Sequence, residues 1–289
     1  MGLLILMQTI NGLASGMLYA ITAFGLTFIL GMLNIPNFAH GALFTLGAYF
    51  GLTLFHLSGN FWLSLLVAPV GVGLIGMLVE WGLLRRLYFD EPEAEHYQLL
   101  LTFAVAVVLQ ELIILIWSPV GQSIMPPRML RGAMNLGVLY YPKYRIFVVI
   151  FSTLLILAVW LFLERTKMGA IIRAGIENSE MVMVLGIDIR KLFTLSFGLG
   201  VLLAGIGGVL ILPIRGANPF MGFDLLAIAF VVVALGGLGN LFGAIFAGLI
   251  IGVAQSLVSI FFPAASWVAV YAAMAIVLIF RPYGLFGTR

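Results

Sequence analysis

The chain has 289 residues, of which 63% are hydrophobic and 9% are charged. It carries no Asp, Glu, Lys or Arg between Met1 and Val79 or between Leu225 and Phe280, whereas a soluble domain usually has about 25% charged residues. These features exclude a water-soluble fold, and 14 basic against 11 acidic residues give no support to nucleic-acid binding. The absence of cysteine excludes disulfides, cysteine nucleophiles and thiolate metal ligands.

Long apolar runs predict membrane spans, so we expect an all-α polytopic membrane helical bundle in one domain, residues 1–289. The first run lacks a basic n-region and a small-residue cleavage site, which favours a retained first helix. About nine spans are expected, at residues 3–31, 40–58, 61–84, 99–117, 146–163, 192–212, 223–238, 241–261 and 265–280. The choice between eight and nine depends on "LNIPNFAHGA" and "ALGGLGNLFGA", where Pro and Gly interrupt the apolar sequence.

Two polar stretches are too long to be simple turns. Residues 118–145 are expected as an external loop, with tyrosines near the membrane interface, and residues 164–191 as a cytoplasmic loop. With residues 85–98 and the C-terminal tail on the cytoplasmic side, that side has nine Lys and Arg residues against five. The positive-inside tendency then places the N-terminus outside and the C-terminus in the cytoplasm.

The charged segment, residues 164–191, holds nine of the 25 charged side chains in 28 residues. It is too polar to cross a bilayer, and its pattern predicts two short helices. Thr166 is expected to cap the first, which ends near Gly175, Asn178 or Ser179 the second, which stops at Gly186, and Asp188 the next span. Arg173 and Glu177 are four apart and are expected to pair if the first helix continues through Gly175.

The charged segment also contains the apolar run "MVMVL", residues 181–185, which needs a cover. An amphipathic hairpin resting on the bilayer or on the protein's own helices is one interpretation. A docking helix for a soluble partner is the other.

The chain resembles a known family over nearly its whole length. The motifs that carry the resemblance are "GLTFILGMLNIPNFAHGALFTLGAYF", "RAGIENSEMVMVLGIDIRKL", "GANPFMGFDLLAIAFVVVALGGLGNLFGAIFAGLIIG" and the terminal "RPYGLFG". They resemble the membrane permease of branched-chain amino-acid ABC importers, the Liv H-like subunit. That likeness implies a permease subunit in the bacterial cytoplasmic (inner) membrane. Its implied partners are a second homologous permease, two ABC ATPase subunits and an external solute-binding protein.

By this resemblance the charged segment is the element that couples the permease to the ATPase. The implied coupling residues are Arg173, Ala174, Gly175, Glu177, Met181, Leu185, Gly186, Ile187 and Asp188. A Walker A loop needs Gly directly before its Lys, but Lys143, Lys167 and Lys191 follow Pro, Thr and Arg. We therefore expect no enzyme activity and no cofactor in this chain, with ATP and Mg bound by the partner ATPases.

Two interrupted segments, residues 34–41 and 213–224, are candidates for a translocation path. Each follows a span and contains Asn, Pro and Phe, so they look like corresponding breaks in an inverted repeat. Backbone groups freed by broken helices should face protein or a water-filled path. The candidate path residues are Asn34, Asn37, His40, Gly41, Asn218 and Pro219. His40 could instead be bonded within a tight turn. Because the three histidines lie on different elements, we expect no histidine metal site.

Gln110 and Glu111 lie within the fourth span, where an ionisable residue is a functional candidate. Glu111 is either a proton relay or a neutral or paired group, with Gln255, Asn11 or a backbone carbonyl as its partner. Glu80 is expected to extend toward the interface. Permeases of the same type for urea, amides or other amino acids, and a stand-alone proton-coupled carrier, are the alternative functions; no catalytic set supports a membrane enzyme.

Overall fold

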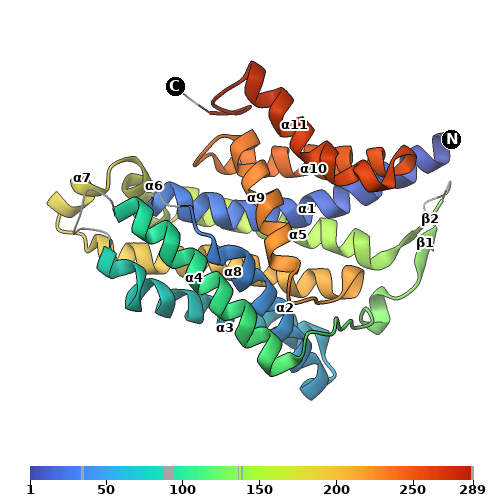
Figure 1. Cartoon of the computed structure of the whole chain (residues 1–289), viewed down its shortest axis with the longest axis horizontal. Helices are drawn as coiled ribbons and strands as arrows, with labels where there is room; N and C mark the ends of the chain where they lie inside the picture. The colour runs from blue at the N-terminus through green and yellow to red at the C-terminus, as the bar shows by residue number, and fades with distance from the viewer. Residues whose placement is uncertain (34–35, 88–93, 136, 138, 288–289) are drawn as a thin grey trace.

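The computed structural model describes residues 1–33, 36–87, 94–135, 137 and 139–287, which form a helical bundle (Figure 1). The helices are α1 (Gly2–Leu33), α2 (Ala39–Ser58), α3 (Phe61–Gly82), α4 (Ala94–Trp117), α5 (Lys143–Arg165), α6 (Lys167–Glu177), α7 (Ser179–Val184), α8 (Ile189–Arg215), α9 (Met221–Gly236), α10 (Leu241–Phe261) and α11 (Ser266–Phe280). Single 3₁₀ turns cover Leu84–Leu87 (η1), Arg128–Leu130 (η2) and Pro263–Ala265 (η3). Strands β1 (Ala133–Asn135) and β2 (Tyr140–Pro142) pair antiparallel.

The described residues contain eight helices that are long and apolar enough to cross a membrane. Helix α9 is shorter: its 16 residues extend about 24 Å, less than the roughly 30 Å of a bilayer core. In Figure 1 it runs across the long helices and returns the chain from the end of α8 to the start of α10. The chain is thus a multi-pass membrane protein, with α9 as the short ninth element that the interrupted sequence had made uncertain.

The two halves of the bundle use the same packing pattern. Helix α1 packs along α10, and α8 packs along α3. Both pairs are antiparallel, because rising residue numbers on one helix meet falling numbers on the other. Helices α1 and α8 also run in opposite directions where they meet, with Thr22 beside Gly207 and Gly25 beside Gly200. This arrangement agrees with the inverted repeat expected from the sequence.

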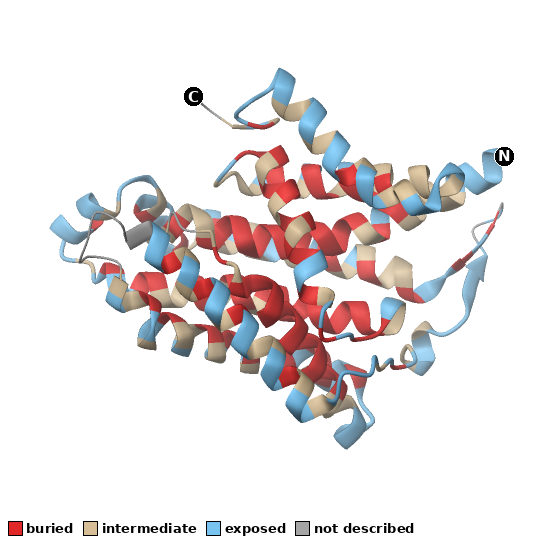
Figure 2. Ribbon diagram, in the orientation of Figure 1, coloured by how far each residue is buried: buried red, intermediate tan, exposed pale blue. Residues whose placement is uncertain are grey.

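Small residues hold the helices at close range. A Cβ on Gly16 would lie 2.9 Å from the carbonyl oxygen of Gly248, and Gly12 and Gly252 make similarly close approaches. Such stripes let helix backbones pack directly in an apolar medium, where van der Waals contact replaces the hydrophobic drive. The buried residues lie mostly along the central helices α1, α2 and α8, as Figure 2 shows.

The loop expected over residues 118–145 ends at Pro142, because α5 begins at Lys143. It contains the two short strands, which the all-helical prediction had not included, and it bridges to the α8–α9 connection through Gln122 and Ala217. The interface role expected for its tyrosines fits only the exposed Tyr140. The Tyr141 hydroxyl donates to Asn11 Oδ1 (3.0 Å) and the Tyr144 hydroxyl to the Leu210 carbonyl (2.9 Å), and both rings are buried.

Candidate functional site

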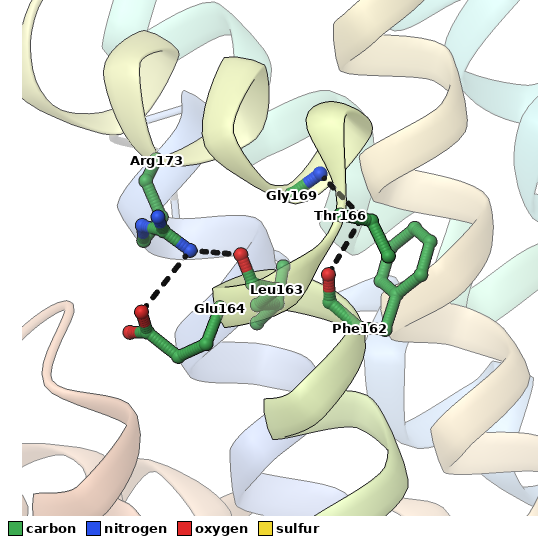
Figure 3. A network of polar contacts seen from close by, with 6 residues as sticks. All are labelled: Phe162, Leu163, Glu164, Thr166, Gly169 and Arg173. Atoms are coloured by element: carbon green, nitrogen blue, oxygen red, sulfur yellow. Dashed lines mark hydrogen bonds and ion pairs between the residues drawn. The ribbon is translucent and has the colours of Figure 1, made fainter.

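The charged segment forms two short helices, α6 and α7, at one end of the bundle (Figure 1). Thr166 Oγ1 accepts the Gly169 N–H (3.0 Å) and donates to the Phe162 carbonyl (2.6 Å), as Figure 3 shows. Asn178 Oδ1 accepts the Met181 N–H at 2.9 Å. These caps satisfy helix N–H groups that have no partner inside the helix. The predicted caps are confirmed, with Asn178 rather than Ser179 at α7.

The segment ends where the sequence predicted. Gly186 has φ +81°, and its N–H donates to the Met183 carbonyl (2.9 Å) while the Ile187 N–H reaches that of Val182 (3.3 Å). A left-handed residue after a helix favours glycine because it has no Cβ to clash. Asp188 Oδ1 then accepts the N–H groups of the first turn of α8, at 3.1 and 3.4 Å.

The electrostatics at Asp188 follow from this cap. Desolvation acts to raise its pKa, but hydrogen bonds from Lys191 and Arg190 and the Lys191 charge outweigh it, so the pKa lies below its ordinary value. Asp188 and Lys191 also form an exposed ion pair, at 3.3 Å. Asp188 is therefore a stable anionic cap that marks the boundary between the segment and α8.

Arg173 ties α6 to α5, not to its own helix. Its guanidinium donates to the Leu163 carbonyl and lies 3.5 Å from the Glu164 carboxylate (Figure 3). The predicted pair with Glu177 is wrong, because α6 folds back over the end of α5, whose last carbonyls need donors and attract positive charge. Glu177 is exposed.

One face of the segment is buried against the bundle. Val182 is 2% exposed and packs in a cluster that includes residues of α1, α5 and α8. Gly175 is buried too: a Cβ there would lie 3.0 Å from Leu192 Cδ2 and 3.3 Å from Met32 Cε. A movement of the segment would therefore be transmitted directly to α1 and α8.

The other face is apolar and uncovered. Met181 is 57% exposed, Val184 81% and Leu185 71%, and Met183 is also exposed. Ala174 and Gly186 are exposed and Ile187 is half-buried. Within the run of residues 181–185, the protein's own helices cover only Val182. The other four residues form an exposed apolar patch.

A cavity of about 770 Å³ lies beside the segment. Its wall includes Glu164, Arg173 and Ile176, the turn between α9 and α10, and the C-terminal tail. The tail folds back onto that turn: Asn240 Nδ2 donates to the Phe286 carbonyl (2.9 Å), and the Leu285 N–H to the Leu235 carbonyl (2.7 Å). This contact of the tail, a latch on the α9–α10 turn, was not predicted, although Asn240 after a glycine-rich turn is a recognisable helix cap.

The candidate path residues on the first break are mostly interior. Asn34 lies outside the described residues. Asn37 is 1% exposed and its Oδ1 accepts the Ala39 N–H (3.1 Å). His40 is fully buried, and its Nε2 lies 3.0 Å from the Thr22 carbonyl, an acceptor, so that nitrogen donates. The His40 ring thus joins α2 to α1, while the bond within the turn is made by its backbone N–H, which donates to the Asn37 carbonyl (3.3 Å).

The structure brings the two breaks together at a glycine pair. A Cβ on Gly41 would meet the carbonyl of Gly222, and a Cβ on Gly222 would meet the carbonyl of Gly41. Pro219 is buried; Asn218 is exposed and its Oδ1 accepts the Phe220 N–H (2.9 Å). A translocation path past these residues stays a prediction.

Of the two acidic residues considered within spans, Glu111 lies in α4 as expected, whereas Glu80 is placed differently. Glu111 is exposed on α4 next to the half-buried Gln110. Its suggested partners are engaged elsewhere: Gln255 accepts the Tyr19 hydroxyl (2.7 Å), and Asn11 accepts that of Tyr141. Glu80 does not extend to an interface; it is fully buried and accepts the Thr194 hydroxyl. Within the described residues, no group of three or more His, Asp or Glu could hold a metal.

Comparison with known proteins agrees with this architecture. Residues 8–280 match the family described as branched-chain amino acid transport system / permease component. The chain is 30% identical to the high-affinity branched-chain amino acid transport system permease protein BraD of Pseudomonas aeruginosa, covering 98% of this chain and 95% of BraD. It is 26% identical to the permease protein LivM of Escherichia coli, over 93% of this chain and 68% of LivM.

A solved structure supports the fold alone. A chain of PsaBC from Streptococcus pneumoniae in complex with Fab aligns with a TM-score of 0.51 and 11% identity, over 93% of this chain and 89% of that one.

Proposed function

The chain belongs to the branched-chain amino acid transport system permease family, and from that we propose that it is the membrane permease subunit of an ATP-driven importer of branched-chain amino acids. The observation that carries the mechanism is the charged segment. Its buried face is tied to α1, α5 and α8, while Met181, Val184 and Leu185 are exposed. A rigidly mounted helix with an uncovered apolar face is suited to dock in a groove of a soluble partner.

In this proposal the soluble partners are two ABC ATPase subunits, which bind ATP and Mg. The chain itself performs no hydrolysis, consistent with lysines that fit no Walker A loop. A second, homologous permease completes the membrane part, an assignment supported by similarity to both BraD and LivM. An external solute-binding protein delivers the amino acid.

The proposed orientation follows the charge distribution. The end with the charged segment faces the cytoplasm, since it gathers nine of the 14 Lys and Arg residues. The β1–β2 hairpin and the N-terminus then face outward, and the membrane is the bacterial cytoplasmic (inner) membrane. ATP-driven closure of the ATPases pushes on α6 and α7, and their contacts with α1 and α8 convert the path from outward-open to inward-open.

The test is reconstitution of the complete transporter in proteoliposomes with the variant Gly175→Pro. Proline inside α6 removes a backbone hydrogen bond and costs about 3 kcal/mol or more, so the docking element should lose its shape. Lys167→Pro is the matched control, because Lys167 is the first residue of α6, where proline is tolerated. We measure ATP hydrolysis and uptake of L-leucine, L-isoleucine, L-valine and urea.

We expect wild-type and Lys167→Pro transporters to take up the three amino acids and not urea. Gly175→Pro should insert in the membrane but fail to link hydrolysis to uptake. Wild-type uptake by Gly175→Pro would refute the coupling assignment, and uptake of urea alone would refute the substrate assignment.

A further inference from the structure

A second cavity, of about 260 Å³, lies where α8 ends and α9 begins. Its lining combines the polar side chains of Arg215, Asn218 and Asp224 with apolar ones that include Ile228 and Trp267. The α8–α9 connection is the break bridged to the 118–142 loop through Ala217, so the cavity lies at the opposite end of α8 from the charged segment. On the proposed orientation it is on the outward side.

Arg215 is exposed at this cavity and contacts a buried hydrogen-bonded pair, Tyr19 and Gln255. Tyr19 is 2% exposed and donates its hydroxyl proton to Gln255 Oε1 at 2.7 Å. The Tyr19 oxygen therefore accepts from Arg215 Nη2, at 3.4 Å. A guanidinium has five N–H donors and remains charged, so this contact orients the group and leaves other donors available. Arg215 forms no ion pair with any described residue.

Asp224 supplies the opposite charge in the same cavity. It is exposed in the first turn of α9, where the helix dipole favours an anion. Although both groups line one cavity, Asp224 and Arg215 do not form an ion pair with each other. The helix dipoles explain why a cation lies at the end of α8 and an anion at the start of α9. They do not explain why the two charges line one cavity without forming an ion pair.

A ligand for this cavity needs an anionic group, a cationic group and an apolar part. Its volume is just below the roughly 300–1,000 Å³ of sites for drug-sized ligands, so the occupant is a smaller molecule. A zwitterionic amino acid with an apolar side chain meets all of these requirements. A simple anion or cation would leave one charge and the apolar wall unused.

We propose that this cavity is the site at which the chain receives its amino-acid substrate. The carboxylate binds Arg215, the ammonium binds Asp224, and the side chain packs on Trp267 and Ile228. The inference rests on the proposed function, since it names where that substrate is held. Tyr19 and Gln255 act as positioning residues for Arg215.

Thiol labelling tests the site directly, because the chain has no cysteine and one introduced residue is the only thiol it carries. Phe220→Cys lies in the cavity wall and is exposed; Tyr140→Cys, exposed on β2, is the matched control. Both are labelled in membranes of cells that express the full chain with its partners, with and without L-leucine. At a leucine concentration of about twice its Kd, labelling of Phe220→Cys should slow about threefold, as 1 + [L]/Kd, and that of Tyr140→Cys should not change.

Ligand analogues separate the two charges. Leucinamide lacks the carboxylate and 4-methyl-2-oxopentanoate lacks the ammonium, so both should protect Phe220→Cys less well than leucine. When Arg215→Gln is added to Phe220→Cys, leucine should no longer protect better than leucinamide. When Asp224→Asn is added, leucine should no longer protect better than the oxo acid. A purely structural role for either residue would change all three ligands alike.

The possible results separate this inference from the proposed function. Paired loss of the two preferences supports the site. If leucine does not slow labelling although the assembled transporter imports it, the site is wrong and the function stands. If leucine protects but the transporter imports none of the three amino acids, the cavity binds leucine, and both the proposed function and the role of the cavity as a substrate site are wrong.

Discussion

The contact between Gly41 and Gly222 allows a sharp test of how the two halves of the bundle fit together. A Cβ on Gly41 would lie 2.8 Å from the Leu226 Cβ, 2.9 Å from the Gly222 carbonyl carbon and closer still to its oxygen. Real Cβ atoms essentially never approach within 3.0 Å. Because the obstacle is backbone, no side-chain rotation relieves it, and α2 and α9 must move apart.

The expected cost of Gly41→Ala follows from this geometry. Overpacking a close contact costs about 1–3 kcal/mol, and a backbone obstacle places this variant at about 2–3 kcal/mol. An unfolding entropy of about 2.1 cal/mol/K per residue gives about 0.6 kcal/mol/K for a chain of 289 residues, so a loss of about 2–3 kcal/mol should lower Tm by about 3–5 °C. Gly222→Ala should be destabilised to a similar extent. The double variant should lose less stability than the sum of the losses in the two single variants, since the first change already separates the helices.

Thermal unfolding of the detergent-purified chain measures this effect. Gly82→Ala is the control, because a Cβ there meets nothing within 4 Å and alanine is the better helix former by up to about 1 kcal/mol. Its Tm should be unchanged or slightly higher. Equal Tm values for Gly41→Ala and Gly82→Ala would refute the reasoning that the two glycines set the distance between α2 and α9.

Three further predictions concern the charged segment and the tail. Val182→Asp places an unpaired charge at a 2% exposed position and should make the segment sensitive to protease, whereas Val184→Asp at an 81% exposed position should keep the fold and reduce co-purification of the ATPase. Arg173→Gln removes the contacts to α5 and should cost about 1 kcal/mol, since the pair is partly exposed; Glu177→Gln should leave Tm unchanged. Asn240→Ala removes the cap of α10 and the bond to the tail, at about 1–2 kcal/mol, and hydrogen exchange in residues 283–287 should speed up; unchanged exchange would argue against the latch.

The local features of the charged segment were predictable from the order of residues. Thr166, Asn178 and Asp188 cap helices, and Gly186 ends one, at the predicted positions. Each of these bonds joins groups at most five residues apart, so the chain needs no distant partner to form it. The membrane spans were predictable for a similar reason, because length and hydropathy are properties of a continuous run.

The predicted partners of polar side chains were wrong where the actual partner lies outside the local stretch of sequence. Arg173 had a suitable carboxylate four residues away, yet it binds the end of α5, because α6 folds back there. Glu80 was expected near an interface, and it is buried against Thr194 because α3 packs along α8. Periodicity places a residue on a face of its helix, but it does not identify the helix that covers that face.

The candidate sites likewise have features that the sequence predicts and features that only the tertiary structure shows. Hydropathy, capping residues and glycine positions along the chain were enough to predict a multi-span helical protein with a charged segment of two short helices and two interruptions between apolar helices. The contact of those interruptions at Gly41 and Gly222 depends on how the inverted halves pack, and the cavity that holds Arg215 and Asp224 depends on how α8, α9 and α11 pack. Bonds between near neighbours form whatever the rest of the chain does, whereas contacts across 180 or so residues exist only once the helices have assembled.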